Sequence, residues 1–220
     1  MSKKRLAKGF DLVAPFYDSC VSLVFGNKIA NFQCDALHLL SSCGSLAIIG
    51  GGTGLLLEKA FKLNLAEHYY YIERSDKMRA ITSNRIGITS KEIEFLNNLS
   101  DMTDSADCFI FPFVLDCYSE HEVEEILIEM KQKLKPSGEI LVVDFDATTT
   151  DTFKRKALIT ILYLFFKVFT RISPWRLPRI KSVFESQGFT KISHSTKLQG
   201  WIFAALYKPS EDYSKTVKHN

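Results

Sequence analysis

The sequence lacks the signatures of several large protein classes. Its five cysteines form no C-x-x-C pair, so neither a disulfide framework nor a zinc site is indicated. The histidines show no H-E-x-x-H spacing, and we expect no metal site. With 28 Lys and Arg against 25 Asp and Glu, the net charge of +3 is too small to indicate a nucleic-acid-binding protein. We therefore expect a cytoplasmic protein with reduced thiols and no nucleic-acid partner.

Long apolar runs are also missing. The most apolar stretch, residues 157–169, is interrupted by Lys167 and is shorter than the roughly 20 residues of a membrane-spanning helix. The basic N-terminus runs into Asp11 and Pro15 instead of the apolar core of a signal peptide, so we do not expect export. Residues 153–171 combine apolar and basic side chains and could rest on an anionic membrane surface.

The sequence instead alternates apolar runs with amphipathic segments. Apolar runs at 46–49, 69–72, 91–96, 108–113 and 139–145 predict strands, and residues 55–61, 76–86 and 122–134 predict the helices between them. This rhythm predicts an α/β fold with a doubly wound, mostly parallel sheet. Beyond residue 152 the pattern indicates a long apolar helix, a short helix at 178–187, and β-like runs at 191–195 and 201–207.

These segments predict one domain over residues 1–209. A helical insertion at about 152–180 would follow the fifth strand, and the polar residues 210–220 would form a flexible tail.

A glycine loop, Gly50-Gly51-Gly52-Thr53-Gly54, follows the first predicted strand. Glycines permit positive φ and let backbone N–H groups approach a ligand closely. The spacing G-x-G-x-G differs from the G-x-G-x-x-G of dinucleotide sites, which disfavours a nicotinamide cofactor. Glu73, about 20 residues on and at the end of the next strand, is placed to accept hydrogen bonds from ribose hydroxyls. The alternative is a tight turn with a solvated capping acid, but both features end adjacent strands, and this favours a nucleoside site.

Two further motifs carry a resemblance to a known family. Residues 10–18 resemble a Tyr-x-x-x-Ala-x-x-Tyr-Asp opening, with Phe10 in place of the first tyrosine. Residues 134–144 are similar to a Leu-Lys-Pro-Gly-Gly signature, with Ser137 in place of one glycine. With the glycine loop and Glu73, these segments resemble class I S-adenosylmethionine (SAM)-dependent methyltransferases of the ubiquinone/menaquinone-biosynthesis type. The resemblance covers residues 10–207 and implies a Rossmann-like fold with SAM as cofactor.

The resemblance also implies which residues surround SAM. They are Tyr17, Gly50, Gly51, Gly52, Thr53, Gly54, Glu73, Arg74, Ser75, Met78, Asn98, Phe111 and Pro112. One position departs from the family, because Ile48 replaces the usual acid two residues before the first loop glycine. This departure leaves open a non-catalytic SAM-fold binding or scaffold protein. The Ile-Ile-Gly-Gly-Gly run also resembles spermidine synthases, but the motifs at 10–18 and 134–144 argue against that relative.

Methyl transfer needs a general base only where the acceptor is poorly ionised. Candidate bases are Asp116 and Tyr118, which follow the fourth strand, and His194 in the C-terminal strand region. The apolar side chains of 153–178 would line a pocket for a lipophilic or aromatic acceptor that is quinone-like, phenolic or a lipid. Alternatively, that helix is ordinary core or a dimer contact.

Overall fold

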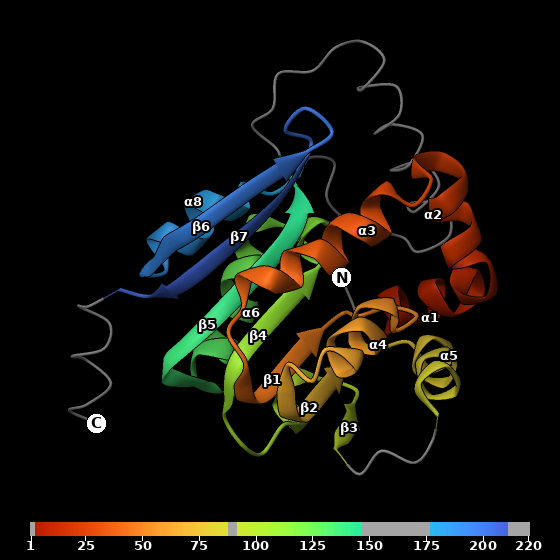
Figure 1. Ribbon diagram of the computed structural model, residues 1–220, viewed down its shortest axis with the longest axis horizontal. Helices are drawn as coiled ribbons and strands as arrows, with labels where there is room; N and C mark the ends of the chain where they lie inside the picture. The colour runs from red at the N-terminus through yellow and green to blue at the C-terminus, as the bar shows by residue number, and fades with distance from the viewer. Residues whose placement is uncertain (1–2, 88–91, 147–176, 211–220) are drawn as a thin grey trace.

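The computed structural model describes residues 3–87, 92–146 and 177–210, and it contains a seven-stranded sheet in the order β3-β2-β1-β4-β5-β7-β6 (Figure 1). The strands are β1 (Cys43–Ile49), β2 (Ala66–Ile72), β3 (Ile93–Leu96), β4 (Ala106–Pro112), β5 (Leu134–Phe145), β6 (Phe189–Lys197) and β7 (Ile202–Pro209). The first five strands pair in parallel, and β7 and β6 extend the sheet in antiparallel pairing. The predicted doubly wound, mostly parallel α/β fold is confirmed.

Helices cover both faces of this sheet. On one side α6 (Glu120–Lys131) and α8 (Ile180–Ser186) pack on an apolar layer that includes Phe109 and Val142. On the other side α4 (Leu55–Lys62) and α3 (Lys28–Asp35) pack on a layer that includes Leu46 and Ile48. Successive residues of a strand point to opposite faces of the sheet, and helices cover both faces. This is why β1 is apolar over residues 46–49 and β4 over residues 108–112.

The helices predicted at 55–61, 122–134 and 178–187 correspond to α4, α6 and α8, and their ends differ from the prediction by up to three residues. Helix α5 (Asp76–Ile86) matches at both ends, and its first turn is capped by the Ser75 hydroxyl, which accepts from Met78 N at 3.2 Å. Helix α6 was expected to continue to residue 134, and this is wrong. Leu134 instead pairs with Ala106 as the first residue of β5, so residues 135–138 belong to the strand. Leu134 is apolar and fits both the helical pattern of α6 and the alternating pattern of a strand. Its pairing with Ala106 of β4 places it in the strand.

The N-terminal helices were not predicted. These are α1 (Lys3–Val13) and α2 (Tyr17–Phe25), and the 3₁₀ turn η1 (Ala14–Phe16) joins them. Both helices lie beside the carboxyl ends of the parallel strands in Figure 1, where they cover the glycine loop. The described residues also form three further 3₁₀ turns: η2 (Ala36–Leu39), η3 (Leu99–Asp101) and η4 (Leu115–Cys117).

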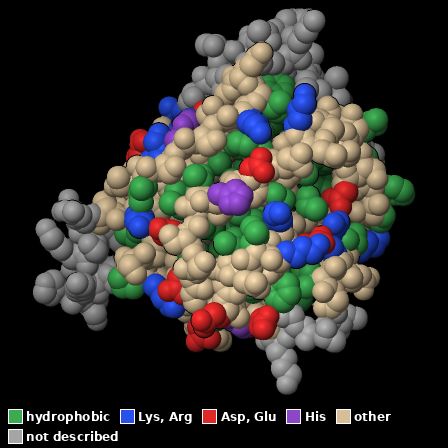
Figure 2. Space-filling model, in the orientation of Figure 1, with side chains coloured by type: hydrophobic (Ala, Val, Ile, Leu, Met, Phe, Trp, Pro, Cys, Tyr) green, Lys and Arg blue, Asp and Glu red, His purple; other side chains and the backbone are tan. Residues whose placement is uncertain are grey.

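The predicted insertion at 152–180 lies outside the described residues apart from 177–180, and so does the tail beyond 210. None of the helices in the described ranges has the length and apolar character that crossing a bilayer requires. Figure 2 shows basic and acidic side chains interspersed over the viewed face, a distribution consistent with the small net charge.

Neighbouring residues of α6 provide a test of this packing. Leu127 is fully buried in the layer beneath the sheet, whereas Ile128 is 51% exposed. We expect Leu127→Ala to lower the free energy of unfolding by about 2–5 kcal/mol, because it removes buried contacts and leaves a cavity. Ile128→Ala should change it by less than about 0.5 kcal/mol. Urea unfolding of both variants measures the difference, and equal effects would contradict the assigned helix face.

Candidate functional site

The glycine loop connects β1 to α4 through three left-handed residues. Gly50, Gly52 and Gly54 have φ of +70°, +63° and +81°. A Cβ at Gly50 would collide with Val114, and one at Gly54 with Thr82, whereas a Cβ at Gly52 would meet nothing within 4 Å. Gly52 therefore leaves open space where it lines the main cavity. Such open space is what a close approach of the backbone to a ligand would require.

Hydrogen bonds from β2 and α5 fix the Gly52 backbone. Its carbonyl accepts from the Tyr71 hydroxyl at 2.8 Å and from Thr82 Oγ1 at 3.1 Å. Its N–H donates to Glu73 Oε2 at 3.1 Å. Side chains of β2, of α5 and of Glu73 after β2 thus hold the loop in this conformation.

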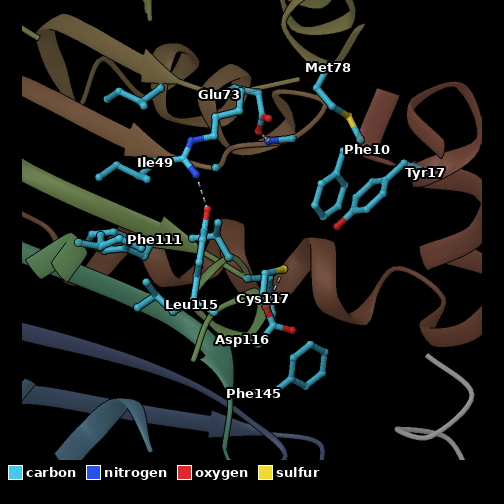
Figure 3. A pocket seen from close by; sticks show the side chains of 18 of the residues that line it. Phe10, Tyr17, Ile49, Glu73, Met78, Phe111, Leu115, Asp116, Cys117 and Phe145 are labelled. Atoms are coloured by element: carbon cyan, nitrogen blue, oxygen red, sulfur yellow. Dashed lines mark hydrogen bonds between the residues drawn. The ribbon is translucent and has the colours of Figure 1, made fainter. Parts of the chain in front are cut away.

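Glu73 ends β2 on the wall of the cavity. Its second oxygen, Oε1, accepts from Ser75 N at 2.8 Å. Burial raises the pKa of Glu73, and the backbone N–H donors oppose that rise. Each carboxylate oxygen accepts one of these two bonds and keeps capacity for a second. In Figure 3 this carboxylate lies across the cavity from Asp116 and Cys117.

Two carboxylates of the N-terminal helices tie them to the site. Asp11 Oδ1 accepts from Ser75 Oγ at 2.6 Å and from Lys77 N at 3.2 Å. Asp18 Oδ1 accepts from Thr53 Oγ1 at 2.7 Å, and Asp18 Oδ2 accepts from Arg85 Nη2 at 2.7 Å. Sequence reasoning missed both acids as site residues, although both belong to the motif at 10–18.

These bonds place aromatic side chains over the cavity. Figure 3 shows the Phe10 ring and the Tyr17 hydroxyl directed into it, opposite Cys117. Burial raises the pKa of Tyr17 far above its usual range, and the neighbouring Cys117 and Asp116 raise it further. Tyr17 therefore stays a neutral phenol at physiological pH.

The buried Asp144 holds the turn that follows β4. Its Oδ2 accepts from Leu115 N at 3.0 Å and from Asp116 N at 3.3 Å, and its Oδ1 accepts from Phe145 N at 2.8 Å. Asp144 is fully buried at the end of β5. Two of its three backbone donors, Leu115 N and Asp116 N, belong to η4, so Asp144 helps to determine where Asp116 lies.

Asp116 is a carboxyl group in a largely apolar part of the cavity. Burial raises the pKa of Asp116 to about 7, and a bond from Cys117 Sγ at 3.5 Å opposes the rise. Burial also raises the pKa of Asp144, and Asp116 raises it further. A pKa near 7 lets Asp116 exchange a proton at physiological pH.

The other two base candidates differ in position. Tyr118 lines the cavity and accepts from Arg74 Nη1 at 3.3 Å; burial raises the pKa of Tyr118 to about 12. Tyr118 is therefore protonated at neutral pH. His194 lies exposed on the edge strand β6 and does not line the cavity, so the structure does not bring it to the site.

The predicted cofactor residues divide into three groups. Seven line the cavity: Tyr17, Gly50, Gly52, Glu73, Arg74, Met78 and Phe111. Five do not line it, although they belong to the same turns and strand ends: Gly51, Thr53, Gly54, Ser75 and Pro112. Asn98 does neither, because its amide and backbone N–H donate to Asp101 in the capping box of η3, and its neighbour Leu99 lines the cavity instead.

Apolar side chains that the sequence analysis did not single out form the wall next to Asp116. They come from α2, α3 and the ends of β4 and β5: Val21, Phe25, Ile29, Phe113 and Phe145. The Phe145 ring centroid lies 5.3 Å from that of Phe113 and 6.2 Å from that of Phe25. Among the residues described, no three His, Cys, Asp or Glu side chains gather as a metal-binding group.

Comparison with known proteins agrees with this geometry. Residues 48–142 match the model of a methyltransferase domain family. Among solved structures, the chain is similar to DhpI in its complex with SAH (S-adenosylhomocysteine), with a TM-score of 0.68 and 18% identity over 95% of this chain and 97% of that one. Residues 48–142 belong to a methyltransferase domain. The class I methyltransferase resemblance and the Rossmann-like fold are confirmed, while the ubiquinone/menaquinone-biosynthesis type stays a prediction.

Other similar proteins are longer than this chain. Des-methyl DIF-1 methyltransferase A of Dictyostelium discoideum is 22% identical over 142 residues, which cover 58% of this chain and 39% of the relative. Mitomycin 7-O-methyltransferase MmcR has a TM-score of 0.65 and 16% identity, over 91% of this chain and 60% of that one. Human N-acetylserotonin methyltransferase in complex with SAM has a TM-score of 0.63 and 19% identity, over 90% and 55%. The chain thus spans well under two thirds of the curated relative.

Two loop glycines give a matched stability test. Both Gly52→Ala and Gly54→Ala place a side chain at positive φ, which costs about 1 kcal/mol. Only the Gly54 variant also collides with Thr82, which adds about 1–3 kcal/mol. We expect Gly54→Ala to unfold at a clearly lower temperature than Gly52→Ala, as measured by calorimetry. Equal melting temperatures would contradict the packing of Gly54 against α5.

Proposed function

We propose that this methyltransferase transfers a methyl group from SAM to a hydroxyl group of a small, apolar aromatic acceptor. The observation that carries the proposal is Asp116, a carboxyl with a pKa near 7 beside a wall of phenylalanine side chains. SAM, when bound, supplies an electrophilic methyl group. The chain's own residues bind and orient the two substrates and accept the acceptor's proton.

The cavity fits a nucleoside-bearing cofactor. Gly52 leaves room where a Cβ would otherwise project, and Glu73 keeps hydrogen-bond capacity for two ribose hydroxyls. Met78 and Phe10 add apolar surface on the same side of the cavity. The solved complexes of DhpI with SAH and of N-acetylserotonin methyltransferase with SAM support the same cofactor for this chain.

The cavity contains acidic side chains although Ile48 stands where the family usually has an acid. Ile48 itself is fully buried in the core on the α3 and α4 side of β1 and cannot face a ligand. Among the described cavity residues, the carboxyl groups belong to Glu73, Asp116 and Glu129, which come from β2, η4 and α6. We propose that Asp116 also lies within reach of the methionine end, because η4 follows β4, the strand next to the glycine loop.

The acceptor class follows from the wall and the base together. Val21, Phe25, Phe113 and Phe145 offer aromatic and aliphatic surface, and their aromatic rings favour stacking with a planar ring. A phenol or quinol hydroxyl is mostly protonated at neutral pH and benefits from a base such as Asp116. Relatives named for des-methyl DIF-1, mitomycin 7-O and N-acetylserotonin transfer support a small-molecule acceptor.

Cofactor binding is tested by calorimetry with SAH. We expect the wild type to bind and Glu73→Gln to bind at least about tenfold more weakly, because an amide offers only one acceptor oxygen to the ribose. Gly52→Ala should also lose affinity, since its methyl group occupies the open space, while it remains folded at 25 °C. If the wild type binds neither SAM nor SAH, the enzyme proposal fails and the scaffold interpretation gains support.

The role of Asp116 is tested with a panel of alkylphenols, naphthols and quinols as acceptors. We expect Asp116→Asn to lower kcat about 100-fold or more, with SAH affinity changed much less. In the wild type, kcat/KM should rise as the pH passes about 7, because only ionised Asp116 accepts a proton.

Stability provides the control for that variant. The folded-state pKa of Asp116 is raised above its unfolded value of 3.8, so the ionised form is disfavoured in the folded protein and stability falls as pH rises through about 7. Asp116→Asn lacks this charge and should be no less stable than the wild type at pH 8. Full activity in a stable Asp116→Asn variant would rule out Asp116 as the base.

A further inference from the structure

The N-terminal helices concentrate the exposed apolar side chains of the described chain. Among the described residues, eight large hydrophobic side chains are exposed, and four of them lie within residues 12–24: Leu12, Phe16, Leu23 and Val24. The first three are 67%, 66% and 88% exposed. Single exposed hydrophobic residues are ordinary, whereas a group of them marks a surface that contacts a partner or a membrane. We call these four side chains the outer patch.

The outer patch follows a helical spacing along the chain. Leu12 and Phe16 are four positions apart, and Leu23 comes seven positions after Phe16, so each lies one or two turns from the next. The backbone keeps right-handed helical angles through η1, at Val13, Phe16 and Tyr17. Figure 1 shows α1 and α2 at the outer end of the molecule, away from β6 and β7. The patch therefore belongs to an outer surface of the described fold.

Helix α2 is apolar on two faces. Its inner side chains Tyr17, Val21 and Phe25 line the cavity, and its exposed side chains include Leu23 and Val24. A helix that packs on a domain needs only its inner apolar face for that packing. The apolar outer face of α2 is thus not explained by packing within the described fold.

Basic residues border the outer patch at both ends. The sequence of α1 begins with three of them at positions 3–5, and Lys8 is exposed one turn before Leu12. Lys28, the first residue of α3, is exposed four positions after Val24. Apolar side chains flanked by lysines are typical of helices that lie on an anionic membrane surface.

The acids of this region are used in bonds to the rest of the protein. Residues 3–25 contain two acids, and both accept hydrogen bonds: Asp11 from Ser75 and Lys77 N, and Asp18 from Thr53 and Arg85. The nearby Asp76, at the start of α5, is paired with Arg79. The excess charge at the outer surface of α1 and α2 is therefore positive.

We propose that the outer patch and the lysines beside it bind the surface of a lipid bilayer that contains anionic lipids. The apolar side chains enter the boundary between headgroups and acyl chains, and Lys8 and Lys28 stay at the depth of the headgroups. This surface is distinct from residues 153–171, which lie outside the described residues. The binding needs neither the cofactor nor the acceptor of the proposed function.

A second copy of the chain suits the outer patch less well than a bilayer does. In a twofold dimer the same surface meets itself, so the basic residues of one copy would approach those of the other. Like charges placed together oppose association, whereas an anionic bilayer offers the complementary charge.

The experiment is flotation of the full chain with vesicles of an equimolar mixture of phosphatidylcholine and phosphatidylglycerol. We expect the wild type to bind these vesicles, and to need at least about tenfold more lipid for half-binding when the vesicles are pure phosphatidylcholine. Leu12→Ser combined with Leu23→Ser should weaken binding to the mixed vesicles by at least about tenfold, because two exposed leucines no longer enter the bilayer. Lys8→Gln combined with Lys28→Gln should weaken it about tenfold.

The matched control is Ile128→Ser combined with Ile192→Ser. It removes two apolar side chains, 51% and 52% exposed, from α6 and β6, and should leave vesicle binding as in the wild type. Thermal melting shows that each variant is folded. Unchanged binding by the folded leucine variant, or an equal loss in the control, overturns the assignment of the surface.

Three further results would overturn the bilayer as the occupant. They are no binding of the wild type to the mixed vesicles, equal binding to both kinds of vesicle, and a dimer in light scattering that the leucine variant alone converts to a monomer. Because flotation uses no SAM, a failure of cofactor binding is a separate result that concerns the proposed function.

Discussion

The Gly52 peptide groups are hydrogen-bonded on both sides, and the geometry of the cavity depends on these bonds. Tyr71 and Thr82 hold the carbonyl, and Glu73 holds the N–H. A left-handed glycine at this point turns the chain from β1 into α4 while exposing backbone to the cavity. Because these partners belong to β2 and α5, the packing of α5 beside the sheet fixes the position of the loop. Glu73 serves both as a support of the loop and as a wall of the site.

Several carboxyl groups lie in or next to the cavity, and they accept hydrogen bonds from backbone N–H groups more than from cationic side chains. Glu73 accepts from two backbone N–H groups, and Asp144 accepts from three. Such bonds reduce the cost of burial without neutralising charge. The Asp116 carboxyl accepts from the Cys117 thiol, and backbone N–H groups of Asp116 and Cys117 also lower its pKa. The two acids differ in position: Asp144 is buried behind the turn that it holds, whereas Asp116 lines the cavity and can meet a ligand.

The sequence predicted those parts of the site that arise from local pattern. The glycine loop, Glu73 and the limits of α5 follow from residue types at short spacing, and the structure contains them as expected. The contributions of Asp11 and Asp18 did not follow, because their partners Ser75 and Arg85 lie 64 and 67 positions away. Such contacts leave no periodic signal in one sequence.

Other differences between prediction and structure have the same cause. Polar residues and Pro15 interrupt the apolar spacing of the N-terminal helices, so their helical character was not evident before their packing on the site was known. His194 was a plausible base by residue type, but the antiparallel pairing of β6 with β7 puts it at the sheet edge. Asn98 likewise satisfies a local capping box instead of facing the cavity. Tertiary packing decided the first two cases, and a local contact three residues along the chain decided that of Asn98.

The described bonds also rank the ways by which a ligand could reach the cavity. On the side of α1 and α2, Asp11 and Asp18 make four hydrogen bonds, one of them to the guanidinium of Arg85. On the opposite side, Arg74 and Tyr118 make one bond in which the acceptor is uncharged. Each of these bonds joins at least one ionised group, so the two sides differ mainly in the number of bonds. Separating Arg74 from Tyr118 breaks one bond, whereas lifting the N-terminal helices, which hold Phe10 and Tyr17 at the cavity, breaks four.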